Sequence, residues 1–269
     1  MSDGTFIPAN VADYSLEEIV QEVEKSAVHY LDALDNELAQ EVGYKEPSPV
    51  IIEKKVLKSS TDQDCGYIDQ EHKKGLGYIS EMTVDTNNGI IIGVDCYPAN
   101  YRESSIILKH IERVKTDIGI NISNLGLDAG YDVGAVHRGL ELLGVTGYVS
   151  CIDFSYDILK REAVYLPELD CFVCPAGVCI DFIKLAYKKS TQNYYRLYRM
   201  STSDRKNCHS CERLSKCSLS YASARICASA YYPAFYRNRC RYESPEFKVM
   251  KRLCSIWAEG GLLSIKART

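Results

Sequence analysis

The spacing of apolar and polar residues predicts alternating strands and helices in the middle of the chain. Strand-like apolar runs span 76–86, 89–97, 122–127 and 147–152, and helical spacing covers 103–118 and 135–143. Asn87-Asn88-Gly89 stands between the first two runs and favours a β-hairpin. This order predicts a mixed α/β sheet with flanking helices.

The pattern is different on either side of this region. Ser15 and Glu18 form a capping box, and apolar residues follow at helical spacing, which predicts an amphipathic helix over 15–42. This helix is expected either to pack on the core or to contact a partner subunit. Residues 44–76 are polar and irregular and predict a connecting arm, whereas an apolar stripe over 246–259 predicts a last helix.

Composition favours a cytoplasmic protein with a substantial core. The chain has 269 residues, of which 46% are hydrophobic, and it contains no apolar run of about 18 residues that would span a membrane. Its start, Met1-Ser2-Asp3-Gly4, lacks the features of a signal peptide. In a reducing compartment the 12 cysteines are expected to bind metal or to be buried thiols rather than disulfides.

Charge is strongly segregated along the chain. Residues 184–252 contain 16 Lys and Arg against 4 Asp and Glu, although the whole chain has a net charge of −4. Such a block predicts a polyanion partner, with Arg237, Arg239 and Arg241 as expected phosphate contacts. The block also holds Tyr187, Tyr194, Tyr195, Tyr198, Tyr231, Tyr232, Phe235, Tyr236 and Tyr242. These rings either stack on unpaired bases or form a local core.

Three acidic residues are the candidate catalytic groups. Asp3 stands near the start of the chain, Asp128 ends the apolar run 122–127, and Glu259 lies beside the apolar stripe of the last helix. Carboxylates at strand ends face the ligand crevice of α/β sheets, and carboxylate oxygens suit Mg²⁺. Asp62, Asp64 and Asp85 compete for the role of the first aspartate and are expected instead in turns or behind the site.

The chain resembles the DDE transposases of bacterial insertion sequences, of the IS4/IS5-like superfamily. The resemblance runs in order through nearly the whole chain, and each of its motifs is weak alone. They are Asp3-Gly4-Thr5-Phe6-Ile7-Pro8-Ala9-Asn10, Ser60-Thr61-Asp62-Gln63-Asp64, Gly77-Tyr78 with Thr83-Val84-Asp85, Asp128-Ala129-Gly130-Tyr131, the cysteines of 174–217 and Trp257-Ala258-Glu259-Gly260.

The resemblance implies an RNase H-like fold in which Asp3, Asp128 and Glu259 hold two Mg²⁺ or Mn²⁺ ions. The ions serve DNA cleavage by water and then strand transfer by the freed 3′-hydroxyl. Lys266 matches the family's phosphate-contacting lysine. Ser255 stands where the family has a basic residue, so Lys251 and Arg252 are the expected substitutes.

The cysteine cluster predicts a zinc site. Cys174, Cys208, Cys211 and Cys217 offer four thiolates, although the spacing from Cys211 to Cys217 is wider than usual. Cys171, Cys179 and His209 are alternative ligands. Unligated thiols remain the other interpretation of this cluster.

The predicted organisation is a catalytic core over 1–159, a basic cysteine-rich insert over 160–243 and a core helix over 244–269. By resemblance the partners are double-stranded DNA, both transposon ends and target, and a second copy in the full-length homodimer, in the nucleoid-associated cytoplasm of a bacterium. The family has further sequence before Asp3 and after Thr269. A truncated, impaired transposase is therefore expected, with Asp3 frayed. The alternatives are an RNase H-like nuclease and a non-enzymatic zinc- and DNA-binding remnant.

Overall fold

The structure of the protein is a computed structural model. It describes residues 1–11, 16–24, 51–70, 73–152, 163–188, 193–217 and 225–259. The chain divides into two compact units. Unit 1 comprises Met1–Leu34, Glu46–Cys151 and Asn238–Thr269, and unit 2 comprises Asp35–Lys45 and Ile152–Arg237.

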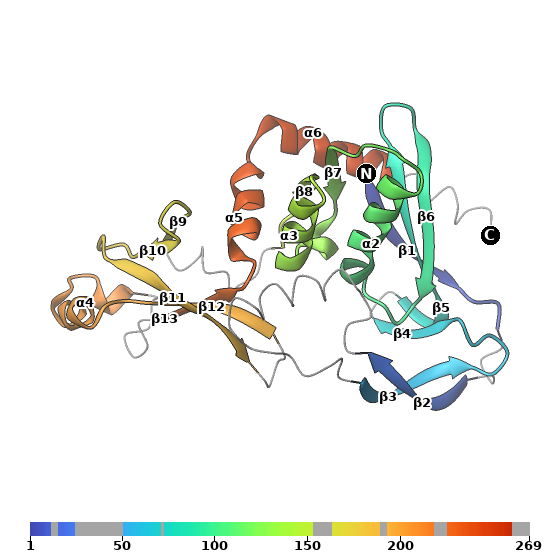
Figure 1. The fold of residues 1–269 in the computed structure, drawn as a ribbon, viewed down its shortest axis with the longest axis horizontal. Helices are drawn as coiled ribbons and strands as arrows, with labels where there is room; N and C mark the ends of the chain where they lie inside the picture. Colours follow the sequence, from blue (N-terminus) through green and yellow to red (C-terminus); the bar gives the residue numbers. More distant parts are fainter. Residues whose placement is uncertain are drawn as a thin grey trace. The chain divides into compact units, whose positions relative to one another are not determined.

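Unit 1 has a mixed α/β core (Figure 1). Its strands are β1 (Ser2–Pro8), β4 (Gly66–Gln70), β5 (Lys73–Asp85), β6 (Ile90–Pro98), β7 (Asn124–Leu127) and β8 (Thr146–Val149). Strand β5 pairs antiparallel with β1, β4 and β6, whereas β7 pairs parallel with β8 and lies beside β1. Its helices are α2 (Glu103–Thr116), the 3-10 turn η2 (Ala129–Tyr131), α3 (Gly134–Leu142), α6 (Pro245–Leu253) and the π-helix η6 (Cys254–Glu259).

The expected strands and helices between residues 76 and 152 are confirmed, including the hairpin between β5 and β6. Their apolar faces form one buried cluster that joins α2 and α3 to β7 and β8. It consists of Ile107, Leu108, Ile111, Val114, Ile122, Leu125, Leu127, Tyr131, Val136, Leu140, Val145 and Val149. Each fully buried aliphatic side chain here contributes roughly 1.5–3 kcal/mol. This cluster therefore holds the end of β7, which precedes Asp128, in a fixed position.

The helix expected over 15–42 is wrong for its first part. Residues Leu16–Glu24 form β2, which pairs antiparallel with β3 (Ile51–Ser59) along its whole length. The β-branched Ile19, Val20 and Val23 favour extended backbone, and the pairing partner lies far along the chain, where the local pattern cannot reveal it. The arm expected over 44–76 likewise contains β3 and β4. Residues 25–42 lie outside the described residues.

Unit 2 is built on a five-stranded antiparallel sheet. Its strands are β9 (Val164–Leu166), β10 (Cys171–Val173), β11 (Cys179–Lys188), β12 (Asn193–Arg199) and β13 (Arg225–Ser229), in the spatial order β13-β12-β11-β10-β9. Short helices α4 (Thr202–Asn207), η4 (Cys208–Ser210) and η5 (Leu214–Lys216) lie between β12 and β13, and α5 (Tyr232–Arg241) follows β13.

Aromatic rings form the core of unit 2. Tyr165, Phe172 and Tyr198 are buried, and Tyr198 packs edge-to-face with both of the other rings, which are tilted against each other. Tyr232 is buried in the same cluster, and Tyr194 is buried nearby against Leu185. The local-core interpretation therefore holds for Tyr194, Tyr198 and Tyr232, which cannot stack on bases without opening this core. No described helix is long and apolar enough to cross a membrane.

Candidate active site

Asp3 is held within a paired strand. Strand β1 begins at Ser2 and runs antiparallel to β5, with Asp3 opposite Met82. Met1 is buried, and its amino group donates a hydrogen bond to the Val84 carbonyl oxygen at 2.9 Å. The fraying expected for Asp3 is therefore not found, because pairing and burial begin ahead of this residue.

Asp128 follows β7, the strand that lies beside β1. Its Oδ1 accepts a hydrogen bond from the Gly130 amide at 2.8 Å, which fixes the carboxylate at the start of η2. In the same way, Asp3 Oδ1 accepts from the Gly4 amide at 2.9 Å. Two neighbouring strands thus present two aspartates, each held by a glycine that follows it.

A third carboxylate, that of Glu103 at the start of α2, lies against both glycines. A Cβ atom at Gly4 would stand 2.6 Å from Glu103 Cγ, and one at Gly130 would stand 3.6 Å from Glu103 Oε2. Only glycine leaves room for this approach at Gly4. Glu103 Oε1 also forms an ion pair with Lys73 Nζ at 2.8 Å, which brings one cation to the acidic cluster.

Neighbouring carboxylates contribute to the raised pKa values of Asp3 and Asp128. Burial, and after it the neighbouring Asp128 and Glu103, raise the pKa of Asp3 from its ordinary 3.8 to about 7, although the Gly4 amide and Lys73 oppose this rise. Partial burial and Glu103 also raise the pKa of Asp128, whose side chain remains open to solvent. The cluster therefore carries negative charge that Lys73 does not fully compensate, the condition that favours binding of a cation.

A buried glutamate, Glu81, links the segments that carry Asp3 and Asp128. Glu81 lies on β5 opposite Gly4 and has no exposed surface. Its Oε1 accepts from Ser2 Oγ at 2.6 Å and its Oε2 accepts from Tyr131 Oη at 2.8 Å. The residues beside Asp3 and after Asp128 are thereby joined through one side chain.

The same network continues away from the site. Thr83 Oγ1 donates to Ser2 Oγ at 3.1 Å and lies 2.7 Å from His110 Nε2. The other His110 nitrogen lies 2.7 Å from Asp95 Oδ2, which also accepts from Arg113 at 3.0 Å. Burial lowers the pKa of His110, although Asp95 opposes this, and the imidazole links β5, β6 and α2. Such satisfied polar networks rigidify a core.

The free energy of unfolding of the metal-free chain should fall as the pH rises from about 4 to 8. Burial raises the pKa of Glu81 from 4.5 to about 8, in the same direction as that of Asp3. The folded state then keeps protons that the unfolded state has released. The stability that is fully present below about pH 4 is therefore lost as the pH rises through the folded-state pKa values of about 7 and about 8. We expect a loss on the order of 3 kcal/mol.

Glu81→Gln should make that pH profile shallower, because it keeps the shape of the buried side chain and removes its titration. Urea unfolding midpoints from pH 4.5 to 9 measure this. Glu112→Gln, on the exposed face of α2, is the matched control and should retain the wild-type slope. A wild-type profile that is flat, or a Glu81→Gln profile as steep as wild type, would contradict the expectation.

Glu259 ends the π-helix η6, which lies against β1 and β5. Trp257, two residues earlier, packs on Met82 and Val84, and Met82 is the residue opposite Asp3. The backbone that carries Glu259 is thus anchored to the strand pair that carries Asp3, although the Glu259 side chain itself lies outside the described atoms. Single π-helical turns occur frequently at functional sites. Lys266 lies outside the described residues.

The predicted DNA contacts fall into two groups. Lys251 and Arg252 are exposed in the last turn of α6, and Arg237 is exposed on α5. Arg239 instead donates to Asp132 at 3.1 Å and Arg241 donates to the Gly147 carbonyl at 3.0 Å. Both bonds lie within unit 1, so a phosphate-binding role for Arg239 or Arg241 would compete with a structural one.

Three of the predicted zinc ligands, Cys174, Cys211 and Cys217, lie in the neighbourhood of the fourth, Cys208. Burial raises the pKa of Cys208, and Cys174, Cys211 and Cys217 raise it further by proximity. The Cys211 amide donates to the Cys208 carbonyl, and the Gly177 amide donates to the Cys174 carbonyl at 2.8 Å, so tight turns present the thiols. Among the described residues, however, only Cys171, Cys179 and Asp181 form a group of three ligand atoms within 4.8 Å of one another.

Sequence reasoning missed Glu103, Lys73 and Glu81. Glu103 was an ordinary first-turn acid of a predicted helix, and Glu81 sat within an apolar strand. The available signal was the glycine after each aspartate, which indicates a close neighbour. The competing carboxylates lie elsewhere: Asp62 accepts from Tyr78 at 2.7 Å, and Asp85 caps the hairpin turn through Asn87 and Asn88.

Comparisons with protein-family models, with curated proteins and with solved structures find no match for this chain.

Proposed function

We propose that this chain is the catalytic domain of a DDE transposase, an enzyme that cuts DNA and joins the freed end to a target. The observation that carries the proposal is the convergence of Asp3 and Asp128 from neighbouring strands, with charge that the protein leaves uncompensated. All-oxygen carboxylate sites of this kind suit Mg²⁺ or Mn²⁺.

The order of elements supports an RNase H-like fold. Strands β6, β5 and β1 are antiparallel neighbours, β7 lies beside β1, and β7 and β8 are parallel. Helices α2 and α3 connect β6 to β7 and β7 to β8, and unit 2 interrupts the chain before α6 and η6. The sequence resemblance implies this arrangement, with the glutamate on the last helix.

The donor set fits a pair of divalent ions. Asp3 and Asp128 would hold them, and Glu259 would complete the set from η6. Bound ions would polarise the phosphodiester and activate the attacking water or 3′-hydroxyl. The acidic residues among the described part of the chain do not form a group of three within 4.8 Å.

The chain's own groups have further roles in this proposal. The Gly4 and Gly130 amides orient the two carboxylates, and Glu81 joins the side chains of Ser2, before Asp3, and Tyr131, after Asp128. Lys73 Nζ, which is one-third exposed and bonded to Glu103, would contact a phosphate oxygen of the bound DNA. Burial, with a smaller contribution from Glu103, raises the pKa of both aspartates, and because the pKa of Asp3 is about 7, ion binding at neutral pH would displace a proton from it.

The test is a DNA cleavage and joining assay with the purified chain. Supercoiled plasmid and a labelled duplex with a free 3′-hydroxyl are incubated with Mg²⁺, Mn²⁺ or EDTA. The proposal expects metal-dependent nicking and covalent joining of the labelled strand. Nicking without joining would favour a nuclease of the same fold. Absence of both with every metal would favour a non-enzymatic DNA-binding protein.

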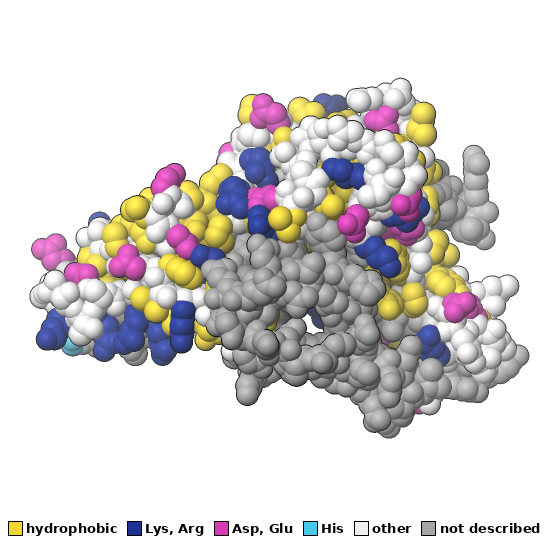
Figure 2. All heavy atoms as spheres, in the orientation of Figure 1, with side chains coloured by type: hydrophobic (Ala, Val, Ile, Leu, Met, Phe, Trp, Pro, Cys, Tyr) yellow, Lys and Arg dark blue, Asp and Glu magenta, His cyan; other side chains and the backbone are white. Residues whose placement is uncertain are grey.

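DNA binding should be sensitive to salt and independent of sequence. The exposed cations of unit 2 include Lys184, Arg199, Arg205, Lys206, Arg213, Arg225 and Arg237. Figure 2 shows Lys and Arg side chains gathered along the lower edge of that unit, near α4 and the sheet. Phosphate contacts release counterions, so affinity falls as salt rises.

Replacing Arg205, Lys206 and Arg213 together by glutamate should weaken binding to all duplexes alike. It should also reduce the slope of log affinity against log salt by about 2–3, near one for each lost contact. Fluorescence anisotropy between 50 and 300 mM salt, about the range where counterion release is resolved, measures this. The charge-preserving triple exchange of Arg for Lys and Lys for Arg is the control. Unchanged slopes in the glutamate variant would reject this surface as the DNA contact.

We also infer a structural zinc ion at Cys174, Cys208, Cys211 and Cys217. The support is the proximity of the other three thiols to Cys208, which is costly for thiolates unless a cation binds them. Tetrahedral Zn–S bonds near 2.3 Å would draw the four sulfur atoms together. Loss of one zinc per chain in Cys211→Ser, measured by metal analysis, is the expected result.

A further inference from the structure

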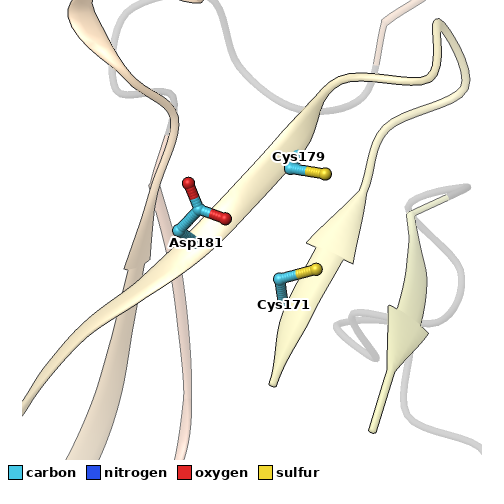
Figure 3. Close-up of side chains that lie close together, drawn as sticks. All are labelled: Cys171, Cys179 and Asp181. Carbon is cyan, nitrogen blue, oxygen red and sulfur yellow. The ribbon is translucent and has the colours of Figure 1, made fainter. Parts of the chain in front are cut away.

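Three potential metal ligands meet on the sheet of unit 2, apart from the cysteines around Cys208. Figure 3 shows Cys171 on β10 with Cys179 and Asp181 on β11. The two sulfur atoms and a carboxylate oxygen all lie within 4.8 Å of one another. Cys171 is buried, whereas Cys179 and Asp181 are exposed.

The strand register accounts for this grouping. Cys171 pairs directly with Asp181, and Cys179 lies two residues before Asp181, so all three side chains project from one face of the hairpin. Phe172 and Ile180, which alternate with them, point to the opposite face and are buried in the aromatic core. The three ligands are therefore carried by two strands whose other face is fixed by packing.

The turn of the hairpin fixes the register further. The Cys174 amide donates to the Val178 carbonyl at 3.0 Å, and the Gly177 amide donates to the Cys174 carbonyl at 2.8 Å. A slip of one residue would turn Phe172 and Ile180 out of the core. The ligand set is thus preorganised before any ion binds.

We propose that Cys171, Cys179 and Asp181 bind a zinc ion, with water as the fourth ligand. Two thiolates and a carboxylate are a ligand set that Zn²⁺ accepts in tetrahedral geometry. Sulfur atoms about 3.7 Å apart are required for Zn–S bonds of 2.3 Å. Small rotations of the two cysteine side chains would bring their sulfur atoms to this distance.

The surroundings of the three ligands favour binding of a cation over a disulfide between the two cysteines. The Cys171 and Cys179 thiols hydrogen bond to each other, and Asp181 adds negative charge next to them. In the part of the chain that the structure describes, the Asp181 carboxylate takes part in no hydrogen bond or ion pair, so both oxygens are available. A disulfide is disfavoured, because diagonal neighbours on adjacent strands have Cα atoms roughly 7–8 Å apart, beyond the usual span.

The neighbouring strand balances the charge of the occupied site. Two thiolates, a carboxylate and Zn²⁺ leave a net charge of about −1. Arg199, exposed on β12, pairs directly with Asp181 on the same face and lies opposite Arg225 of β13. These cations favour deprotonated thiols when zinc binds. The water position remains open, as in zinc sites that accept an outside ligand.

The test compares zinc binding by the full chain and by variants of this site. Zinc content is measured by metal analysis, and Co²⁺ substitution reports thiolate ligation by its charge-transfer absorption. Cys179→Ser, exposed and tolerated by the fold, should lose one zinc per chain. Asp181→Asn should keep the thiolates but weaken zinc at least about tenfold in a chelator competition. Cys227→Ser, an exposed thiol on β13, is the matched control and should bind as wild type.

Cys171→Ser should repeat the result of Cys179→Ser, and near-UV circular dichroism of the tyrosine core checks that the variants fold. Wild-type zinc content and affinity in both Cys179→Ser and Asp181→Asn would overturn the proposal. So would a wild-type chain without zinc, or an equal loss in Cys227→Ser. The readout does not depend on DNA cleavage, so it is independent of the proposed function.

Discussion

Asp128→Asn should reduce metal-dependent DNA cleavage by at least about 1,000-fold. A metal ion contributes several kcal/mol of charge stabilisation, and each 1.4 kcal/mol corresponds to a factor of ten. Asparagine keeps the size of the side chain and an oxygen that can accept from the Gly130 amide, so the start of η2 is retained. The loss should therefore come from the missing charge.

The measurement is the initial rate of plasmid nicking at saturating Mn²⁺. Asp3→Asn should show a loss of the same order, whereas Glu112→Gln should cleave at the wild-type rate. Unfolding midpoints of both asparagine variants should equal or exceed that of wild type, because neutralisation removes repulsion in the metal-free cluster. Cleavage by Asp128→Asn within tenfold of wild type would exclude this carboxylate from the reaction.

Asp170→Ala should destabilise unit 2 by about 3–5 kcal/mol. Asp170 Oδ1 accepts from Tyr165 Oη at 2.7 Å and from Tyr198 Oη at 2.8 Å, and Oδ2 accepts from Arg196. Removing the carboxylate leaves two buried hydroxyls and a largely buried guanidinium without their acceptor. Asp170 also has φ of 45°, a conformation that aspartate tolerates better than alanine.

Denaturant unfolding followed by tyrosine near-UV circular dichroism measures this change. Glu168→Ala, exposed in the same turn between β9 and β10, should alter the free energy of unfolding by less than about 0.5 kcal/mol. Asp170→Asn keeps one acceptor and the backbone conformation. Its free energy of unfolding should lie between those of Asp170→Ala and Glu168→Ala. If Asp170→Ala unfolds like Glu168→Ala, the network does not hold the core together.

Local sequence patterns were sufficient to predict a helix or strand where the element is amphipathic and clear signals mark its ends. The helices near 103 and 135 have apolar faces at helical spacing, and the hairpin carries Asn-Gly between apolar runs. The same kind of local signal misled at residues 16–24, where Ser15 and Glu18 have the spacing of a capping box but Glu18 lies in β2. Pairing with β3 outweighs that signal, since a sheet partner some 35 residues away contributes no local periodicity.

The candidate site was predictable only in part. Asp3 and Asp128 stand in short motifs with glycine, so sequence reasoning could find them. Glu103, Lys73 and Glu81 reach the site through tertiary packing and have no local signature. Likewise, the Cys171–Asp181 pairing depends on strand register, whereas the spacing of cysteines along the chain pointed first to Cys174 and Cys208.

Binding of Mn²⁺ by the purified chain tests the central claim most directly. Electron paramagnetic resonance titration should detect Mn²⁺ bound in competition with Mg²⁺, with proton release near pH 7 because the pKa of Asp3 is about 7. Asp128→Asn and Glu259→Gln should weaken this binding at least about tenfold, and Cys179→Ser should leave it unchanged. Equal Mn²⁺ affinity in wild type and Asp128→Asn would contradict the metal site that the two aspartates are proposed to form.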